Sequence, residues 1–159
     1  MKSVTLITDG SCIGNPGPGG WACLLRLERD DQQGRHTREL SGSVAQTTNN
    51  RMELTAVIQG LSALKESCEV KIVTDSAYVH KGITEWMQQW KRKGWQTSDK
   101  KPVKNQDLWK ALDESLARHR VSWKWVKGHA THADNIRVDQ LANDAARLQA
   151  KASPLHPKS

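Results

Sequence analysis

The sequence reads VTLITD at residues 4–9 and VKIVTD at residues 70–75, two apolar runs that each end at an aspartate. Short runs rich in Val, Ile and Thr predict β-strands. Two further acids, Glu53 and Asp139, lie in the opening turns of segments with helical spacing, beside apolar residues that must face a sheet. Carboxylates at strand ends and helix starts can converge on one point, where they would suit a hard cation such as Mg²⁺.

Each acid taken alone has a structural alternative. Asp9 could form a turn, and Asp75 could cap the helix that follows it. Glu53 and Asp139 could favour the dipole of the helices that they open. All four together are harder to explain as caps, because clustered carboxylates repel one another and burial raises that cost. A bound cation would offset it.

The charge of the chain indicates an anionic partner. Among 159 residues, 24 are Lys or Arg and 17 are Asp or Glu, which gives a net charge of +7 and a pI near 9.5. Such an excess favours nucleic acid, although a basic surface that binds nothing is the alternative. With the four acids, it predicts metal-dependent chemistry on a phosphodiester.

The length predicts one domain over residues 1–150, followed by a disordered tail over residues 151–159. Three cysteines without CxxC spacing are expected to be reduced, in a cytoplasmic protein. We expect no signal peptide before the first strand, and no apolar run approaches the roughly 20 residues of a membrane span. A monomer is expected.

The remaining pattern predicts an α/β fold. Strands are expected at 4–9, 21–29, 36–44, 70–75 and 121–126, and helices from Thr47 or Thr48, at 76–90, at 106–119 and over the stretch around Val138 and Leu141. The glycine-rich stretch 14–20 is expected to be a turn and residues 30–34 a hairpin tip. Three strands joined by turns, then strands alternating with helices, predict a mixed sheet with helices on its faces.

His129 lies in a predicted loop between the last strand and the last helix, directly after Gly128. Imidazole titrates near neutrality, so a proton carrier would suit this position. The alternative is an exposed loop histidine without a role. A zinc site with His132 is disfavoured, because no cysteine pair or third ligand completes it nearby.

A second group of candidate residues lies between residues 86 and 109. Tryptophans alternate there with cations, namely Trp86, Trp90, Trp95 and Trp109 with Lys91, Arg92, Lys93, Lys100, Lys101 and Lys104. Cations can bind phosphates, and indoles can pack against sugars or bases. Nearby in sequence only Asp99 interrupts the cations. Helical spacing suggests a core role for Trp86, Trp90 and Trp109, which leaves Trp95 as the better surface candidate.

Five stretches resemble bacterial type I ribonuclease H: ITDGSCIGNPGPGGW, TTNNRMEL, VTDSAYV, KGWQTSDKKPVKNQDLW and WVKGHATHADNIRVDQLA. They follow the order of that family and cover residues 4–148. The resemblance implies the ribonuclease H fold, a five-stranded mixed sheet flanked by helices whose first three strands are antiparallel. It also implies an endoribonuclease that hydrolyses the RNA strand of RNA–DNA hybrids and leaves 5′-phosphate and 3′-hydroxyl ends.

The resemblance also implies roles for single residues. Two Mg²⁺ ions, for which Mn²⁺ can substitute, would be held by Asp9, Glu53, Asp75 and Asp139, and His129 would assist proton movement or product release. The RNA 2′-hydroxyls would face Cys12, Asn15 and Asn49. The DNA strand would lie along Thr48, Arg51 and Asn105, near a phosphate pocket. A basic protrusion, residues 86–104, would grip the hybrid through Trp86, Trp90, Lys91, Arg92, Lys93 and Trp95.

The chain departs from the bacterial pattern at Ile136, where an acid is usual, and at Ala77, where Gln is common. The hairpin over residues 28–38 is longer than in the enteric type. Three alternatives to this function are a polymerase-associated or integrase-like nuclease, a non-catalytic hybrid-binding module and a nucleic-acid chaperone. The complete basic protrusion argues against the first, and neither of the others needs four converging acids.

Overall fold

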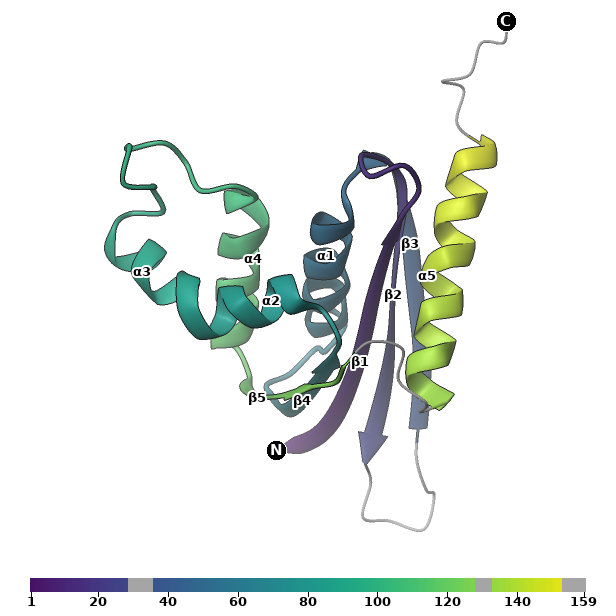
Figure 1. The fold of residues 1–159 in the computed structure, drawn as a ribbon. Helices are drawn as coiled ribbons and strands as arrows, with labels where there is room; N and C mark the ends of the chain where they lie inside the picture. Colours follow the sequence, from purple (N-terminus) through teal and green to yellow (C-terminus); the bar gives the residue numbers. More distant parts are fainter. Residues whose placement is uncertain (29–35, 128–132, 153–159) are drawn as a thin grey trace, which may run out of the picture.

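Five strands form one mixed sheet in the computed structural model, which describes residues 1–28, 36–127 and 133–152. The strands are β1 (Lys2–Cys12), β2 (Gly17–Glu28), β3 (His36–Thr47), β4 (Cys68–Thr74) and β5 (Arg120–Trp125), and they lie in the order β3-β2-β1-β4-β5. The first three strands are antiparallel to one another, whereas β4 runs parallel to both β1 and β5. The predicted sheet is therefore confirmed (Figure 1).

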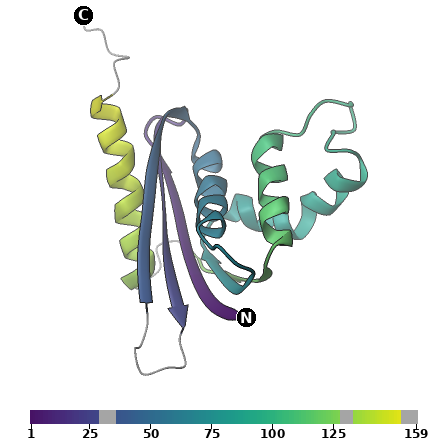
Figure 2. The same ribbon diagram turned by 180° about the vertical axis from the view of Figure 1, so that it is seen from behind.

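Helices cover both faces of this sheet (Figures 1 and 2). On one face, α1 (Asn49–Ser62) lies against β1 and β2, and α4 (Gln106–Ala117) packs on the outside of α1. On the other face, α5 (Ala133–Ala152) crosses β1, β2 and β3. Between β4 and α4 the chain forms α2 (Ala77–Lys81), a π-helical turn η1 (Gly82–Trp86) and α3 (Met87–Arg92). None of the described helices is long and apolar enough to cross a lipid bilayer.

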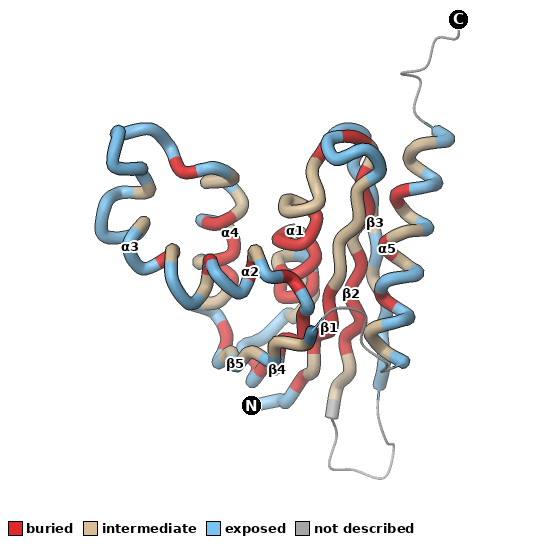
Figure 3. Tube along the Cα trace, viewed as in Figure 1, coloured by how far each residue is buried: buried red, intermediate tan, exposed pale blue. Residues whose placement is uncertain are grey.

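The alternation of side chains along β1 builds two hydrophobic layers. Leu6 joins the cluster that contains Leu54 and Trp109, on the side of α1 and α4. The next residue, Ile7, joins a second cluster with Val138 on the side of α5. This is the period of two that a strand imposes. Figure 3 shows the buried residues gathered along the central strands and the inward face of α1.

Two expected boundaries are corrected at the glycine-rich stretch and at the helix that follows β4. Residues 17–20, expected to be a turn, belong to β2, where Gly19 and Gly20 pair with both β1 and β3 and Gly17 pairs with β3. Glycines carry no side chains, so they give no periodic signal of a strand. The helix predicted over residues 76–90 is interrupted by η1, and Ser76 caps it by accepting a hydrogen bond from the Val79 N–H (3.1 Å).

At other boundaries the helix ends are clear. Thr48, one of the two predicted caps, begins α1 by accepting a hydrogen bond from the Arg51 N–H (3.3 Å). Helix α5 continues through Ala152, so Lys151 and Ala152 are helical and the predicted disordered tail cannot begin at residue 151. The remainder of that tail, 153–159, and the predicted hairpin tip, 30–34, lie outside the described residues.

Strand β1 and helix α1 approach each other closely at Gly10. A Cβ atom on Gly10 would lie 2.6 Å from the backbone nitrogen of Glu53 and 2.6 Å from the carbonyl carbon of Met52. Both atoms belong to the backbone, so the helix itself would have to move to make room. Because Gly10 follows Asp9, this contact determines how near Glu53 can come to Asp9.

The substitution Gly10→Ala should therefore lower both stability and the affinity for a divalent cation. Forcing a methyl group into a packed contact costs about 1–3 kcal/mol, which lowers the Tm of a chain of this size by several degrees. Thermal unfolding measures the first effect, and calorimetric titration with Mg²⁺ measures the second. Parental values in both experiments would mean that α1 can retreat from β1 at no cost.

Candidate active site

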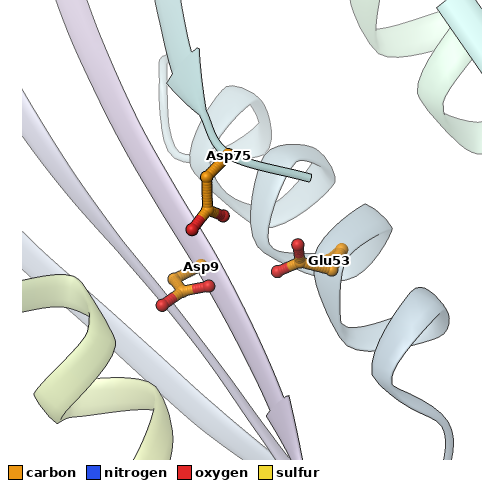
Figure 4. Close-up of side chains that lie close together, drawn as sticks. All are labelled: Asp9, Glu53 and Asp75. Carbon is orange, nitrogen blue, oxygen red and sulfur yellow. The ribbon is translucent and has the colours of Figure 1, made fainter. Parts of the chain in front are cut away.

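Three carboxylates converge where β1, β4 and α1 meet (Figure 4). Asp9 belongs to β1, Asp75 directly follows β4, and Glu53 lies in the second turn of α1. Each contributes an oxygen atom that lies within 4.8 Å of the others. The parallel register pairs Ile7 with Val73, and Asp9 and Asp75 each lie two residues further along. The two aspartates are thus brought side by side, as predicted, although only Asp75 lies at a strand end: β1, expected to end at residue 9, continues to Cys12.

Burial makes this cluster costly without a counter-charge. The Glu53 side chain is only 7% exposed, and its Oε1 atom has no hydrogen-bond partner among the described residues. Burial, and then the Glu53 charge, raise the pKa of Asp9 to about 9, although the Gly10 N–H donates a hydrogen bond to Asp9 Oδ1 (2.9 Å). Burial and the Asp75 charge raise the pKa of Glu53 as well. An all-oxygen set with excess negative charge fits a hard divalent cation.

Asp139, the fourth predicted ligand, comes from α5 and lies outside this group of three. Its exposed side chain contacts the carboxyl group of Asp9, and that contact further raises the pKa of Asp9. One turn later, Asn143 donates from Nδ2 to Asp139 Oδ2 (3.3 Å) and accepts from the Ser11 hydroxyl (2.5 Å). Neither Asn143 nor Ser11 was predicted from the sequence, although the spacing of four residues between Asp139 and Asn143 was a usable signal.

His129, the predicted proton carrier, and His132 lie outside the described residues, between β5 and α5. The described chain ends on one side at Lys127 and resumes on the other at Ala133. A cavity of about 370 Å³ lies next to Asp75, and its lining includes His80, Trp125 and Lys127.

The first group of predicted substrate residues surrounds the N-terminus of α1. The Asn49 N–H donates to Asn15 Oδ1 (2.9 Å), which ties the loop between β1 and β2 to the helix. Thr48 is the helix cap, and Cys12 Sγ lies 3.4 Å from the carbonyl oxygen of Thr47. The structure therefore brings together Cys12, Asn15, Thr48 and Asn49 on one polar surface.

Arg51 extends from this surface to α4. Its guanidinium donates to both carboxylate oxygens of Asp107 (3.0 and 2.7 Å) and to Asn105 Oδ1 (3.2 Å). The Asn105 side chain in turn donates to the Tyr78 hydroxyl (2.9 Å). Arg51 and Asn105 are thus adjacent, as predicted. The carboxylate of Asp107, which orients Arg51, was not foreseen because it lies 56 residues away in sequence.

The second group forms the basic protrusion, which extends from the body of the molecule beside α3 (Figure 1). Its rings contact one another in series, with centroid distances of 5.7 Å for Trp86–Trp90, 6.4 Å for Trp90–Trp95 and 5.4 Å for Trp90–Trp109. Lys91, Arg92 and Lys93 are exposed at the end of α3. The protrusion therefore carries exposed cations beside a group of contacting tryptophan rings.

Trp95, the predicted surface candidate, is half-buried, as are Trp86 and Trp90, whereas Trp109 is fully buried. Trp95 packs against the main hydrophobic cluster, because the chain turns back at Gly94 (φ +67°) and the Trp95 N–H donates to the Trp90 carbonyl (2.7 Å). One expectation for this protrusion was wrong: the charge of Lys91 is partly neutralised, since Asp113 Oδ1 of α4 lies 3.1 Å from its Nζ atom. Inspection of the neighbouring sequence could not reveal a partner 22 residues away.

Replacing Asp9 with Asn should stabilise the metal-free protein. The raised pKa of Asp9 means that folding loses stability as the pH rises from about 4 towards 9, because the unfolded chain ionises first. Asn does not ionise and keeps an oxygen for the Gly10 N–H. In EDTA we expect a gain of about 1–3 kcal/mol at pH 8, as each unit of pKa shift corresponds to about 1.4 kcal/mol, and a smaller gain at pH 5.

Thermal unfolding at both pH values measures this effect. The exposed Asp144, which pairs with Arg147, provides the control Asp144→Asn, which should change stability by no more than about 0.5 kcal/mol. A gain for Asp9→Asn that does not grow with pH would contradict the electrostatic explanation. Added Mg²⁺ should stabilise the parent protein more than the variant.

Comparison with known proteins agrees with this geometry. The model of the RNase H family matches residues 1–147. Ribonuclease H of Solibacter usitatus (strain Ellin6076) is 62% identical over 152 residues, which are 96% of this chain and all of that protein. Ribonuclease HI of Neisseria meningitidis serogroup B is 59% identical over 145 residues, covering 91% of this chain and 96% of that protein.

A solved structure extends the similarity to three dimensions. LC9-RNase H1, a type 1 RNase H with the type 2 active-site motif, superposes with a TM-score of 0.85 at 34% identity, over 94% of this chain and 74% of that one. The strand order and the two helical layers described above are therefore those of an RNase H. With the family model matched over nearly the whole sequence and relatives of this identity, the chain belongs to the ribonuclease H family.

Proposed function

We propose that this protein is an endoribonuclease that hydrolyses the RNA strand of RNA–DNA hybrids and leaves 5′-phosphate and 3′-hydroxyl ends. The observation that carries the proposal is the convergence of Asp9, Glu53 and Asp75 within 4.8 Å, in a chain whose relatives are named Ribonuclease H. A hybrid-binding module or a chaperone would have no use for three carboxylates whose proximity and burial raise the pKa values of two of them.

Asp9, Glu53, Asp75 and Asp139 would hold two Mg²⁺ ions, with Mn²⁺ as a possible substitute. Bound there, the ions would favour deprotonation of the attacking water and stabilise the charge on the departing 3′ oxygen. The protein fixes the ligands: the Gly10 N–H orients Asp9, and the packing around α1 orients the buried Glu53. His129, which precedes α5 in the sequence, would assist proton movement or product release.

The hybrid would be recognised by its shape and its 2′-hydroxyls, without base edges. Cys12, Asn15 and Asn49 would face the RNA strand, and Thr48, Arg51 and Asn105 would bind the DNA strand at a phosphate. Two of these contacts are prearranged, since Asn15 is bound to Asn49 and Arg51 is held beside Asn105 by Asp107. Prearranged groups lose less entropy when the substrate binds.

The substitution Asp75→Asn tests the catalytic proposal. It keeps the shape of the side chain but removes a charged ligand, so cleavage of a labelled RNA–DNA hybrid in Mg²⁺ should fall at least about 100-fold, since the loss of several kcal/mol of charge stabilisation is involved. Hybrid binding should persist. The parent protein should cleave the RNA strand in Mg²⁺, stop in EDTA, and leave duplex DNA intact.

Asp144→Asn, an isosteric change at an exposed aspartate of α5, is the matched control and should cleave as the parent does. Parental turnover by Asp75→Asn would remove Asp75 from the mechanism. Cleavage by the parent in EDTA would exclude the metal-dependent reaction altogether.

The basic protrusion is tested by the double substitution Arg92→Ala with Lys93→Ala. Lys91 is left in place because its ion pair with Asp113 supports α3 against α4. Losing two phosphate contacts away from the scissile bond should raise KM for the hybrid and leave kcat close to parental. Such contacts bind the substrate and the transition state equally, so their loss weakens binding without slowing the chemical step. The slope of log Kd against log salt should flatten by up to about 1.8, using about 0.9 per contact.

The matched control, Arg147→Ala with Lys151→Ala, removes the same two charges from α5, on the opposite face of the sheet (Figure 1). It should leave KM and the salt slope unchanged. If both double variants changed KM and the salt slope equally, the net charge of +7 would attract the hybrid as a whole and the protrusion would make no local contact with it.

A further inference from the structure

Two hydrogen bonds connect β1 to Asp139 through one side chain of α5. The Ser11 hydroxyl donates to Asn143 Oδ1 (2.5 Å), and Asn143 Nδ2 donates to Asp139 Oδ2 (3.3 Å). Asp139 also contacts Asp9, which stands two residues before Ser11 on the same strand. Strand β1 and helix α5 are therefore connected twice, by the contact of Asp9 with Asp139 and by the hydrogen bond of Ser11 to Asn143.

The periods of the two elements explain this arrangement. Residues two apart on a strand share a face, so Asp9 and Ser11 both point towards α5. Residues four apart on a helix are neighbours on its surface, so Asp139 and Asn143 lie one turn apart on the same side. Each pair on β1 thus meets the matching pair on α5.

A glycine sets the distance between the two elements. Gly20 of β2 pairs with Ser11 in the sheet. A Cβ atom on Gly20 would lie 2.3 Å from the carbonyl oxygen of Ala142 and 2.6 Å from the backbone nitrogen of Ala146. The backbone of α5 therefore rests directly on the sheet beside Ser11, which puts Asn143 within hydrogen-bond reach of it.

The chemistry of the amide suits this position. An ionised carboxylate can only accept hydrogen bonds, so the Nδ2 side of Asn143 must face Asp139. The Oδ1 side then faces Ser11, whose hydroxyl is able to donate. Asn is thus used as both donor and acceptor, and it fixes the orientation of Asp139 relative to the strand that carries Asp9.

We infer that Asn143, anchored by Ser11, is a positioning residue that holds Asp139 in the orientation needed to bind a divalent cation with Asp9. This inference rests on the proposed function, in which Asp139 is a metal ligand. Glu53 is held in place by burial. Asp139 is exposed on a helix surface, so its orientation depends more on a hydrogen bond. Groups that hydrogen-bond to metal-ligating carboxylates commonly change metal affinity 10–100-fold when they are removed.

The substitution Asn143→Ala tests this role by two readouts. The Mg²⁺ concentration for half-maximal hybrid cleavage should rise about 10-fold, while the maximal rate at saturating Mg²⁺ recovers most of its parental value. Calorimetric titration of the protein with Mg²⁺, without hybrid, should show weaker binding by a similar factor. Ser11→Ala should act in the same direction but less strongly, and the double variant should be no worse than Asn143→Ala alone, because both belong to one chain of hydrogen bonds.

Gln149→Ala is the matched control. Gln149 Oε1 accepts a hydrogen bond from the Ser43 hydroxyl (2.8 Å), so this variant also removes a hydroxyl–amide bond between α5 and the sheet, but at a position further along the helix than Asn143. Its Mg²⁺ dependence should match that of the parent protein, whatever its Tm. An equal shift of the Mg²⁺ dependence in Gln149→Ala would show that general loosening of α5 is the cause and would overturn the inference.

Asp139→Asn separates the inference from the proposed function. If Asp139→Asn cleaves like the parent, the assignment of Asp139 as a ligand fails and the positioning role falls with it. If Asp139→Asn loses activity while Asn143→Ala keeps parental Mg²⁺ binding and Mg²⁺ dependence, the proposed ligand stands and only the role of Asn143 is refuted.

Discussion

Parallel hydrogen bonding between β1 and β4 places two aspartates side by side, and the other parts of the site are arranged around that pair. The register that joins Ile7 to Val73 leaves Asp9 and Asp75 at the same edge of the sheet. Helix α1 then adds Glu53, because Gly10 allows the helix backbone to come against β1. On the other face, the contact of α5 with β2 at Gly20 adds Asp139. A slip of one residue in the central register would turn these side chains to opposite faces.

The packing that brings the acids together also raises the electrostatic cost of ionising them. Burial and mutual repulsion raise the pKa values of Asp9 and Glu53, and one oxygen of Glu53 is left without a hydrogen bond among the described residues. The hydrophobic layers on either side of the sheet hold this arrangement in place, since the neighbouring residues Leu6 and Ile7 anchor β1 to opposite clusters. In the proposed function, a bound divalent cation would relieve this repulsion and stabilise the charge that develops during the reaction.

Two acids of α4, Asp107 and Asp113, hold cations of neighbouring elements in ion pairs. Asp107 accepts two hydrogen bonds from Arg51 and so keeps its guanidinium beside Asn105, where in the proposed function it would bind a phosphate of the DNA strand. Asp113 pairs with Lys91 and joins α3 to α4. Arg92 and Lys93 extend from the end of the same helix into solvent. The positive charge near the site is therefore divided between an arginine held by Asp107 and exposed cations at the end of α3.

Much of this could be predicted from the sequence, because short-range patterns encode it. Alternating and helical apolar spacing predicted the five strands and most helices, and acids at the ends of apolar runs predicted that carboxylates would cluster. Three features depended on tertiary structure. Residues 17–20 form a strand without any side-chain period; Trp95 turns inward at Gly94; and Asp107, Asp113 and Ser11 find partners 56, 22 and 132 residues away. The amino-acid sequence alone specifies which side chains are able to ionise and which are apolar, since these are properties of each residue type. Only the tertiary structure decided which charges meet, because the contacts between β1, α1, α4 and α5 are set by packing across the sheet.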